Sequence, residues 1–374
     1  MRTRLIWEYS RAEERARQIG ARLAGPLVVS DGGAIYPTRS DDIVALLHDT
    51  TRLTHPMRGH DETQPWVPTG AAPAEHTRYR AILNPLFKPR ALAWLIPSVQ
   101  QHASELVDAV AARGQCEVVA EIGRPLAVQT LLTLLGLPTG NLEKLLRLLA
   151  RQAELPRSAP LSADLVEYAR RAVPAARPPG VISALRNEFD DAEILSFVLL
   201  LFSAAIETTT AAISCALFEL ATDPQLRALV IRHPDQMGTF VNEVLRLYSP
   251  IGYCPRVTLE EVTIGGVSVP PLTELELSLR TLNLDGGHVI TYSDDKVHGC
   301  PFYSFGAGSR RCLGMLVARL QIGVLVGEFL RRITGFTLTP PGHVEMNVGG
   351  DSTRLGPTAV SLQWSAWEPR DAEL

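Results

Sequence analysis

The hydrophobic pattern along the chain predicts a protein built mainly from helices. Apolar residues recur at helical spacing in four successive segments, at 99–113, 118–135, 141–152 and 162–173. The next segment is the longest: it begins near Asp190 or Asp191, either of which can cap a helix, and ends before Asp223-Pro224. About thirty residues at 1.5 Å per residue span roughly 45 Å, the width of a whole domain. The first half is apolar on nearly all sides, so we expect this helix to be buried.

Short alternating segments predict small sheets near both ends of the chain. Leu27-Val28-Val29 and Ala34-Ile35-Tyr36 flank a Ser-Asp-Gly-Gly turn, which is typical of a β-hairpin. A second hairpin is expected over 262–269, and the tail alternates over 336–338 and 359–364. Ser40 is expected to cap a short helix that ends near His48.

The middle of the long helix carries polar residues in the run Ala204-Ala205-Ile206-Glu207-Thr208-Thr209-Thr210. A carboxylate and three threonines are poor choices for a buried helix centre, because buried charges are costly and β-branched residues lose rotamer freedom. Two explanations stay open. The threonines bond carbonyls one turn earlier while Glu207 reaches a salt bridge, or the run is a functional site.

A glycine-rich stretch at 305–314 holds one cysteine, Cys312, directly before a long apolar-periodic segment. Its three glycines let the backbone turn tightly and approach a bulky group. Free N–H groups at the start of a helix favour a thiolate, which is the ligand that a cysteine-bound haem iron requires. The alternative is an ordinary strand-to-helix turn that contains a buried cysteine.

Composition excludes several classes of protein. The chain has 374 residues, is 46% hydrophobic and carries a net charge of −4, with no basic run interleaved with aromatic residues, so no nucleic-acid partner is expected. The five cysteines are scattered without a Cys-x-x-Cys pair, which favours a reducing cytoplasm. The longest apolar stretch, 194–205, is too short to span a bilayer, so we expect no membrane anchor.

Together, these segments resemble the cytochrome P-450 family of haem-thiolate monooxygenases, over nearly the whole chain and in order. The run Phe305-Gly306-x-Gly308-x-Arg310-x-Cys312-x-Gly314 is similar to the haem loop of that family. Ala204-Ala205-x-Glu207-Thr208 is similar to its acid–alcohol pair. Glu243-x-x-Arg246 is similar to its Glu-x-x-Arg pair, which braces the core together with a third residue.

The resemblance implies a mainly α fold with small β-sheets: one haem-binding domain over 1–374, with a β-rich part at about 20–60 and in the tail, and an α-rich core at about 75–335. It also implies haem b with Cys312 as the axial iron ligand. The other residues that it places at the cofactor are Phe305, Gly306 and Gly314 in the loop, Ala204 and Ala205 on the long helix, and His76, Arg80, Arg256 and Arg310 as counter-ions of the propionates.

The activity implied is oxygen activation and hydroxylation, or another oxidation, of a small organic molecule in secondary metabolism such as antibiotic biosynthesis. Electrons would come from NAD(P)H through ferredoxin reductase and ferredoxin to a monomeric enzyme, with Glu207 and Thr208 relaying protons. The residues expected at the substrate are Trp66, Phe202, Ile251 and Tyr253. Two alternatives stay open: an oxidative coupling or rearrangement catalyst acting on a bulky or carrier-bound substrate, and a non-catalytic binding module.

The chain departs from the family pattern at four places. Ala205 stands where the family usually has glycine, and Asn283-Leu284-Asp285 stands for Asn-Arg-Asp. The run from Asn283 to Phe305 is short and lacks the usual Pro-x-Arg-Phe element. The lid region, 137–194, is also short, which predicts a more open site.

Overall fold

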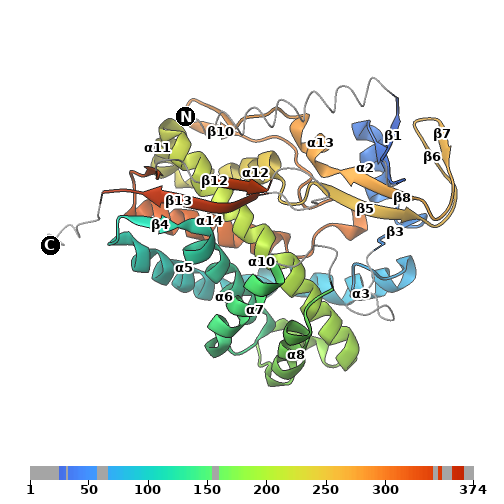
Figure 1. Ribbon diagram of the computed structural model, residues 1–374, viewed down its shortest axis with the longest axis horizontal. Helices are drawn as coiled ribbons and strands as arrows, with labels where there is room; N and C mark the ends of the chain where they lie inside the picture. The colour runs from blue at the N-terminus through green and yellow to red at the C-terminus, as the bar shows by residue number, and fades with distance from the viewer. Residues whose placement is uncertain are drawn as a thin grey trace.

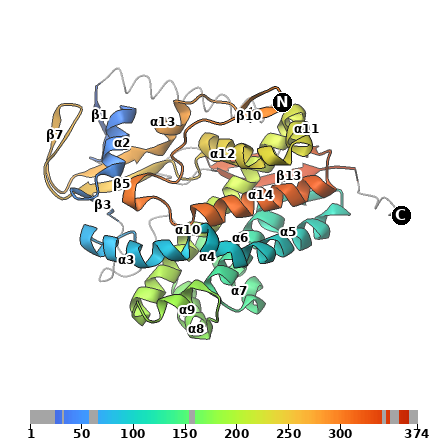
Figure 2. The ribbon, with the colours of Figure 1, turned by 180° about the vertical axis from the view of Figure 1, so that it is seen from behind.

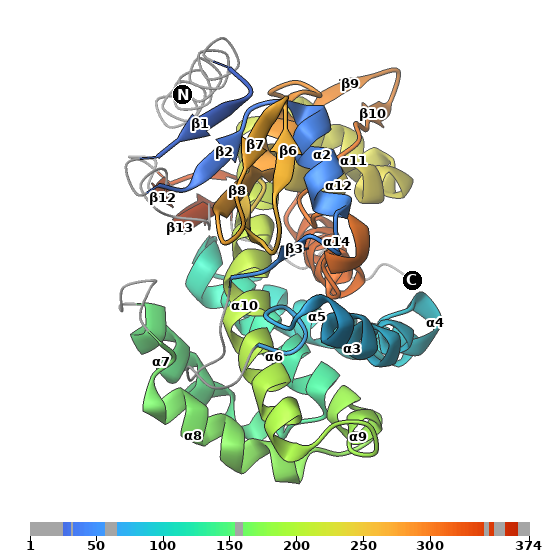
Figure 3. The ribbon, with the colours of Figure 1, turned by 90° about the vertical axis from the view of Figure 1, so that its right-hand side faces the viewer.

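A computed structural model describes residues 25–30, 33–56, 66–153, 160–339, 344–347 and 356–365. Within these residues the fold is mainly helical with small sheets, as the sequence predicts (Figure 1). Most of the strands lie towards one end of a single long helix, α10 (Asp191–Thr222), and helices α7 to α9 (142–185) lie towards its other end (Figure 3). The predicted β-rich part at about 20–60 falls partly outside the described residues.

Helix α10, Asp191–Thr222, runs through the centre of the molecule (Figure 1). Its start is a capping box, in which the Asp190 side chain accepts from the Glu193 N–H and the Glu193 side chain accepts from the Asp190 N–H. Both predicted ends are confirmed. Ile194, Phe197 and Leu217 are among its many buried side chains, so the expected burial is confirmed as well.

The remaining helices pack around α10 or lie beside the strands of the largest sheet (Figure 2). They are α2 Ser40–His48, α3 Pro73–Leu86, α4 Pro89–Leu92, α5 Ile96–Ala111, α6 Arg124–Leu135, α7 Leu142–Ala153, α8 Ala163–Ala172, α9 Val181–Leu185, α11 Pro224–Arg232, α12 Met237–Tyr248, α13 Leu279–Leu284 and α14 Met315–Arg332. A π-helical segment, η2 Val119–Gly123, leads directly into α6. Helices α5, α6, α12 and α14 contact one another or α10, and thereby form the core.

The largest sheet has the strand order β1-β2-β8-β5-β3. Its strands are β1 Leu27–Val29, β2 Ile35–Pro37, β3 Leu53–Thr54, β5 Tyr253–Thr258 and β8 Glu274–Ser278. The pair β2–β8 is parallel with Ile35 opposite Leu275, while the other pairs are antiparallel. Both strands of the hairpin predicted at the N-terminal side are confirmed as β1 and β2.

Three smaller groups of strands complete the described fold. They are the hairpin β6 Val262–Ile264 with β7 Val267–Val269, the hairpin β9 Thr291–Ser293 with β10 Lys296–His298, and a sheet of β4 Gln115–Glu117, β11 Thr337–Leu338, β12 Val344–Asn347 and β13 Gly356–Gln363. The predicted hairpin over 262–269 and the predicted tail strands are therefore confirmed. In the tail sheet, β13 packs against α10.

The expected N-cap at Ser40 is wrong. Arg39 occupies the cap position of α2 without a side-chain cap, and Ser40 is the first helical residue. The Ser40 hydroxyl instead donates to the Asp285 carboxylate, far away in the sequence. A tertiary partner has therefore replaced the local capping bond.

Helix α10 is the single helix in the described part of the chain that is long and apolar enough to cross a membrane. However, 61% of its most apolar window is buried inside the fold. Such burial is typical of the core helix of a globular protein.

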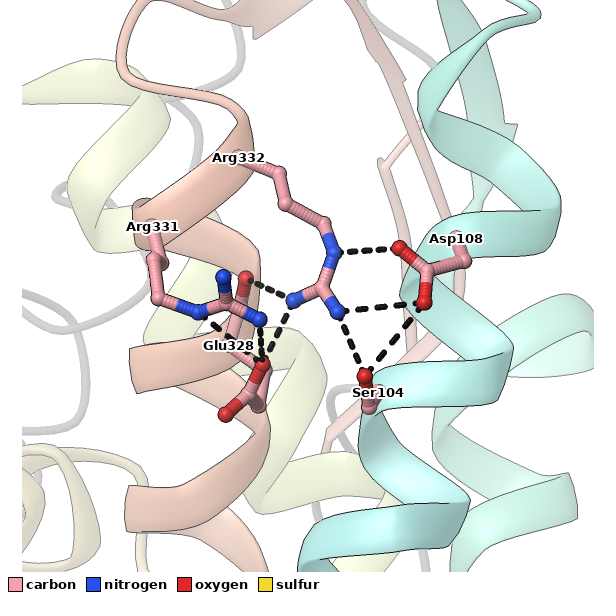
Figure 4. A network of polar contacts seen from close by, with 5 residues as sticks. All are labelled: Ser104, Asp108, Glu328, Arg331 and Arg332. Carbon is pink, nitrogen blue, oxygen red and sulfur yellow. Dashed lines mark hydrogen bonds and ion pairs between the residues drawn. The ribbon is translucent and has the colours of Figure 1, made fainter. Parts of the chain in front are cut away.

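A polar network joins α5 to α14 (Figure 4). The Arg332 guanidinium donates to the Asp108 carboxylate and the Ser104 hydroxyl on α5, and also to Glu328 on its own helix. Arg331 donates to the same Glu328 carboxylate from Nη2 at 2.8 Å. Each arginine of this network therefore has a carboxylate partner.

Candidate active site

The loop before α14 is shaped by its glycines. Gly306 and Gly308 have φ of +66° and +68°, a region that non-glycine residues rarely adopt. A Cβ on Gly308 would also lie 2.7 Å from the Leu47 carbonyl oxygen of α2. The loop is therefore packed backbone to backbone against α2, which holds the residues that follow in place.

Cys312 is held at the end of this loop. Its N–H donates to the Phe305 carbonyl at 2.8 Å, and its side chain has solvent-exposed surface. Burial among surrounding protein atoms raises the pKa of the thiol, while a hydrogen bond from the Gly314 N–H and the charge of Arg80 act in the opposite direction. The residue is therefore accessible although much of the protein surrounds it. A metal ion bound there would deprotonate it outright.

The four residues expected as propionate counter-ions gather beside this loop. His76 and Arg80 come from α3, Arg256 from β5, and Arg310 from a short 3₁₀ turn, η6 Gly308–Arg310. Burial, with the charges of Arg310, Arg80 and Arg256, lowers the pKa of His76 to about 4. Burial and the charges of Arg256 and Arg80 lower the pKa of Arg310 to about 10. These shifts show that the groups lie close enough to repel one another.

The three arginines bond mainly to backbone and hydroxyl oxygens among the described residues, and Arg256 also contacts the Cys254 thiol. Arg80 Nη1 donates to the Arg311 carbonyl at 2.9 Å, and Arg256 Nη1 donates to the Pro255 carbonyl at 2.8 Å. Arg310 donates mainly to the carbonyls of residues 69 and 71, at 2.9 and 3.1 Å. The Nε atoms of Arg80 and Arg310 are buried without a hydrogen-bond partner in the described part of the chain.

Sequence reasoning missed a fifth member of this cluster, His55. It follows β3, and burial with the charges of Arg256 and Arg310 lowers its pKa to about 3. A lone histidine in a loop rich in Pro, Gly, Thr and His carries no spacing signal, so only the fold identifies it. We call His55, His76, Arg80, Arg256 and Arg310 the cation cluster.

The cation cluster and Cys312 fit a haem. In the described part of the chain no carboxylate forms an ion pair with Arg80, Arg256 or Arg310. Of these arginines Arg256 is buried and the other two are half-buried, and cations gathered in this way are costly unless an anion joins them. Two propionates would supply that anion and accept the free Nε–H groups, while the accessible thiol would supply the axial ligand.

The polar run in α10 opens towards one side. Ala204 is exposed and Ala205, Glu207 and Thr208 are half-buried, whereas Ile206 between them is fully buried. The Thr208 hydroxyl donates to the Ala204 carbonyl at 2.8 Å. Glu207 accepts from Arg124, with Nε to Oε1 at 3.2 Å and Nη2 to Oε2 at 3.4 Å. Thr208 and Glu207 thus make the contacts of the structural explanation, whereas the buried Thr210 hydroxyl has no hydrogen-bond partner among the described residues, and the run still has an accessible face.

Comparison with known proteins agrees with this geometry. The family model described as Cytochrome P450 matches residues 180–236 and 237–348. The chain is 28% identical over 353 residues to the mycinamicin IV hydroxylase/epoxidase of Micromonospora griseorubida, covering 87% of this chain and 88% of that protein. It is 28% identical over 361 residues to the nocardicin C N-oxygenase of Nocardia uniformis subsp. tsuyamanensis, with the same coverage of both chains.

Solved structures share the fold. A mutant of P450 EryK in complex with erythromycin B superposes with a TM-score of 0.82 at 22% identity, covering 96% of this chain and 99% of that one. P450BioI, solved in complex with an acyl carrier protein ligated to hexadec-9Z-enoic acid, gives a TM-score of 0.81 at 23% identity, covering 94% and 98%. The chain is therefore similar to cytochromes P450 over nearly its whole length. These similarities support a haem-dependent monooxygenase.

The Glu243–Arg246 pair is buried, with both side chains 1% exposed. Arg246 donates to the Glu243 carboxylate from Nε and, at 2.8 Å, from Nη2. Nη1 donates to the carbonyls of residues 283 and 287, and Nη2 also donates to that of residue 289. The third member of the expected brace is not a side chain: the Cys300 N–H donates to Glu243 Oε1 at 2.9 Å. Backbone groups thus complete the brace in the absence of the Pro-x-Arg-Phe element.

Asn283 reinforces the short run before Phe305. Its amide donates to the hydroxyls of Ser249 and Ser304, at 3.1 and 2.8 Å, and its Oδ1 accepts from the Tyr303 N–H. Asn283 is fully buried. The run therefore keeps a defined path to Phe305 although it is short.

The residues predicted at the substrate have different environments. Trp66 and Phe202 are buried, and the Phe202 ring packs on Tyr168 with centroids 6.1 Å apart. The Tyr253 ring packs edge-on against Tyr36, with centroids 5.7 Å apart. Ile251 is partly buried, and its carbonyl accepts from the Ser249 hydroxyl. Each has a packing or backbone role in the fold, and contact with a substrate stays a prediction.

Proposed function

We propose that this protein is a cytochrome P450 that binds haem b through Cys312 and oxidises a small organic molecule, most often by hydroxylation, in secondary-metabolite biosynthesis. The observation that carries the proposal is the cation cluster, which lies beside an accessible thiol and lacks any carboxylate partner for its arginines in the described residues. The relatives named as a mycinamicin hydroxylase/epoxidase and a nocardicin N-oxygenase support the metabolic setting.

The residues would share the work as follows. Cys312 would ligate the iron, with the Gly314 N–H holding the sulfur, and Phe305 and Gly306 would shape the loop beneath it. The cation cluster would hold the propionates by charge-assisted hydrogen bonds. When bound, the haem supplies oxygen activation and the radical chemistry, while the protein orients the reactants and excludes side reactions.

The open face of α10 would serve the opposite side of the cofactor. Ala204 and Ala205 would line the space next to it, and the extra methyl of Ala205 would narrow that space. The Thr208 hydroxyl and the Glu207 carboxyl would hold water and pass protons inward from solvent, because both side chains are partly accessible on one helix face.

The partners follow from this chemistry. We infer that NAD(P)H supplies electrons through a ferredoxin reductase and a ferredoxin to a monomeric, cytoplasmic enzyme. The substrate would lie near Trp66, Phe202, Ile251 and Tyr253, under a lid formed by 137–194 whose shortness leaves the site more open.

Reduction and treatment with carbon monoxide test the proposal. The wild-type protein should show the thiolate-type Soret shift, and Cys312→Ser should lose it while Cys300→Ser keeps it. A wild-type spectrum without that shift would contradict an oxidising function and favour the alternative of a non-catalytic binding module.

Product analysis separates the remaining alternative. Incorporation of ¹⁸O from labelled O₂ into the product indicates hydroxylation. A new bond within or between substrates, without label, indicates coupling or rearrangement instead.

A further inference from the structure

Arg124 makes a two-point contact with Glu207. Its Nε lies 3.2 Å from one carboxylate oxygen and its Nη2 lies 3.4 Å from the other, so one edge of the guanidinium matches the carboxylate. The side chains are 22% and 35% exposed, which places the pair between core and solvent. In the part of the chain that the structure describes, no other side chain or backbone group hydrogen-bonds to the Glu207 carboxylate.

The backbone that carries Arg124 is fixed against α10. Arg124 is the first residue of α6, directly after the π-helical segment η2. A Cβ on Gly123, the last residue of η2, would lie 3.3 Å from Thr210 Cγ2, so this junction lies against α10 about one turn beyond Glu207. Single π-helical turns inside helices occur frequently at functional sites.

A second contact fixes the same turn of α10 through the tail sheet. A Cβ on Gly356, at the start of β13, would lie 2.5 Å from the Ala211 Cβ. The helix is therefore held at Thr210 and Ala211 by two elements. Because α10 and η2 cannot shift easily, the Arg124 guanidinium reaches Glu207 from a defined position.

Such a contact has a large effect on a carboxylate that must work in one orientation. An isolated glutamate side chain samples several rotamers, and fixing them costs conformational entropy. A guanidinium fork fixes the carboxylate plane, whereas a lysine ammonium supplies charge without that plane.

We propose that Arg124 is a positioning residue for proton delivery by Glu207; the inference rests on the relay role given to Glu207 above. Arg124 holds the Glu207 carboxylate in one orientation, next to Thr208 in the sequence of α10. The Glu207 carboxyl gives its proton to a water at the Thr208 hydroxyl, and a proton from solvent replaces it. The ionised carboxylate left between these events is the form that Arg124 binds, so the pair re-forms in each cycle.

Four variants of the haem-loaded protein test the inference: Arg124→Gln, Arg124→Lys, Glu207→Gln and the double variant Arg124→Gln/Glu207→Gln. The control is Arg113→Gln, which breaks the ion pair of Arg113 with Glu121 on η2 without touching α10. NADPH oxidation is measured without substrate, with a surrogate ferredoxin and its reductase, in H₂O and D₂O. The melting temperature of each ferric protein is measured in parallel.

Arg124→Gln should slow NADPH oxidation between about 10- and 100-fold and raise its solvent isotope effect, since misplacing a catalytic group costs rates of this order. Glu207→Gln should do the same, and the double variant should be no worse than either single one. Arg124→Lys should recover part of the rate, and Arg113→Gln should match wild type. The lowering of the melting temperature should be non-additive in the double variant, as expected for a direct pair.

Three outcomes would overturn the inference. If Arg124→Gln has wild-type kinetics while Glu207→Gln is impaired, the positioning role of Arg124 is rejected and the relay role of Glu207 is retained. Wild-type kinetics in both single variants would remove the relay role as well. Additive effects on rate and melting temperature, without recovery by lysine, would assign Arg124 to general stability alone.

Discussion

The molecule contains two groups of arginines with opposite surroundings. At the end of α14, Arg331 and Arg332 face Asp108 and Glu328, and every guanidinium has a carboxylate partner (Figure 4). In the cation cluster, one buried and two half-buried arginines lie together with two histidines, and the Nε atoms of Arg80 and Arg310 have no hydrogen-bond partner among the described residues. The charges of the first group are compensated within the protein, whereas those of the second group are compensated only when an anion binds.

This difference separates stability from function. A matched network contributes to folding whether or not a ligand is present. A group of like charges opposes folding by mutual repulsion and desolvation, and the protein tolerates this because ligand binding offsets it. Ligand-dependent behaviour should therefore be confined to the cation cluster.

The largest expected effect is on the pH dependence of the haem-free protein. Burial and nearby arginines hold the pKa of His76 at about 4 and that of His55 at about 3, below the unfolded value of 6.5. Below pH 6.5 the unfolded chain binds more protons, so stability is present above that pH and lost as the pH falls. The loss should approach about 1.4 kcal/mol per pH unit for each histidine. Urea denaturation from pH 7.5 to 4 measures it.

Matched variants sharpen that result. His76→Gln and His55→Gln should each lower the pH dependence of the free energy of unfolding by the share of one proton, about 1.4 kcal/mol per pH unit. His298→Gln, at an exposed position of β10, should leave this pH dependence unchanged. Bound haem should flatten the slope, because the propionates favour the charged histidines. An identical slope in all of these proteins would show that the cluster histidines do not titrate as assigned.

Arg256→Met should weaken haem retention without weakening the haem-free fold. Haem release should accelerate at least about tenfold, because a hydrogen bond to a charged group is worth roughly 1.5–3 kcal/mol. The haem-free protein should be as stable as wild type or more so, since the substitution relieves repulsion with Arg310. Haem transfer to apomyoglobin measures the rate of haem release, and urea denaturation measures the stability of the haem-free protein. Equal destabilisation of both forms would mean that Arg256 is an ordinary structural arginine.

Arg332→Met should show the opposite behaviour. Arg332 is 8% exposed but its partner Asp108 is 61% exposed, so solvent screens part of the interaction. We expect a loss of about 1–2 kcal/mol, equal with and without haem. A loss present only in the haem-bound form would contradict the separation of the two groups.

Arg331→Gln should have the smallest effect. The Arg331 side chain is 63% exposed and bonds a carboxylate that Arg332 already neutralises. Its removal should change the free energy of unfolding by less than about 0.5 kcal/mol, as is usual for exposed pairs. The same urea titrations measure it, and a change above 1 kcal/mol would show that the network is cooperative.

Patterns within single elements predicted most of the fold. The ends of α10 follow from local signals, namely Asp190 as cap and Asp223-Pro224 as stop, and the structure confirms them. The hairpins also follow from alternation and turn residues close together in the sequence. Ser40 shows the limit, because a hydroxyl that fits a local cap was taken by distant Asp285.

The predicted haem loop and counter-ions depended on motif spacing, and the structure places those residues together. His55 and Arg124 could not be found in this way. Arg124 is separated from Glu207 by 83 positions, and the pair exists only because η2 and α6 pack on α10. Contacts made by tertiary packing between isolated polar residues leave no pattern in one sequence.

The backbone contact at position 300 has an evolutionary consequence. Glu243 receives its hydrogen bond there from a main-chain N–H, which every residue except proline provides. Substitutions at position 300 should therefore have little effect on the Glu243–Arg246 brace. Other sequences with the same short run should accept any residue except proline at this position. Selection would act on the length of the run, because inserting or deleting one residue moves the N–H away from Glu243.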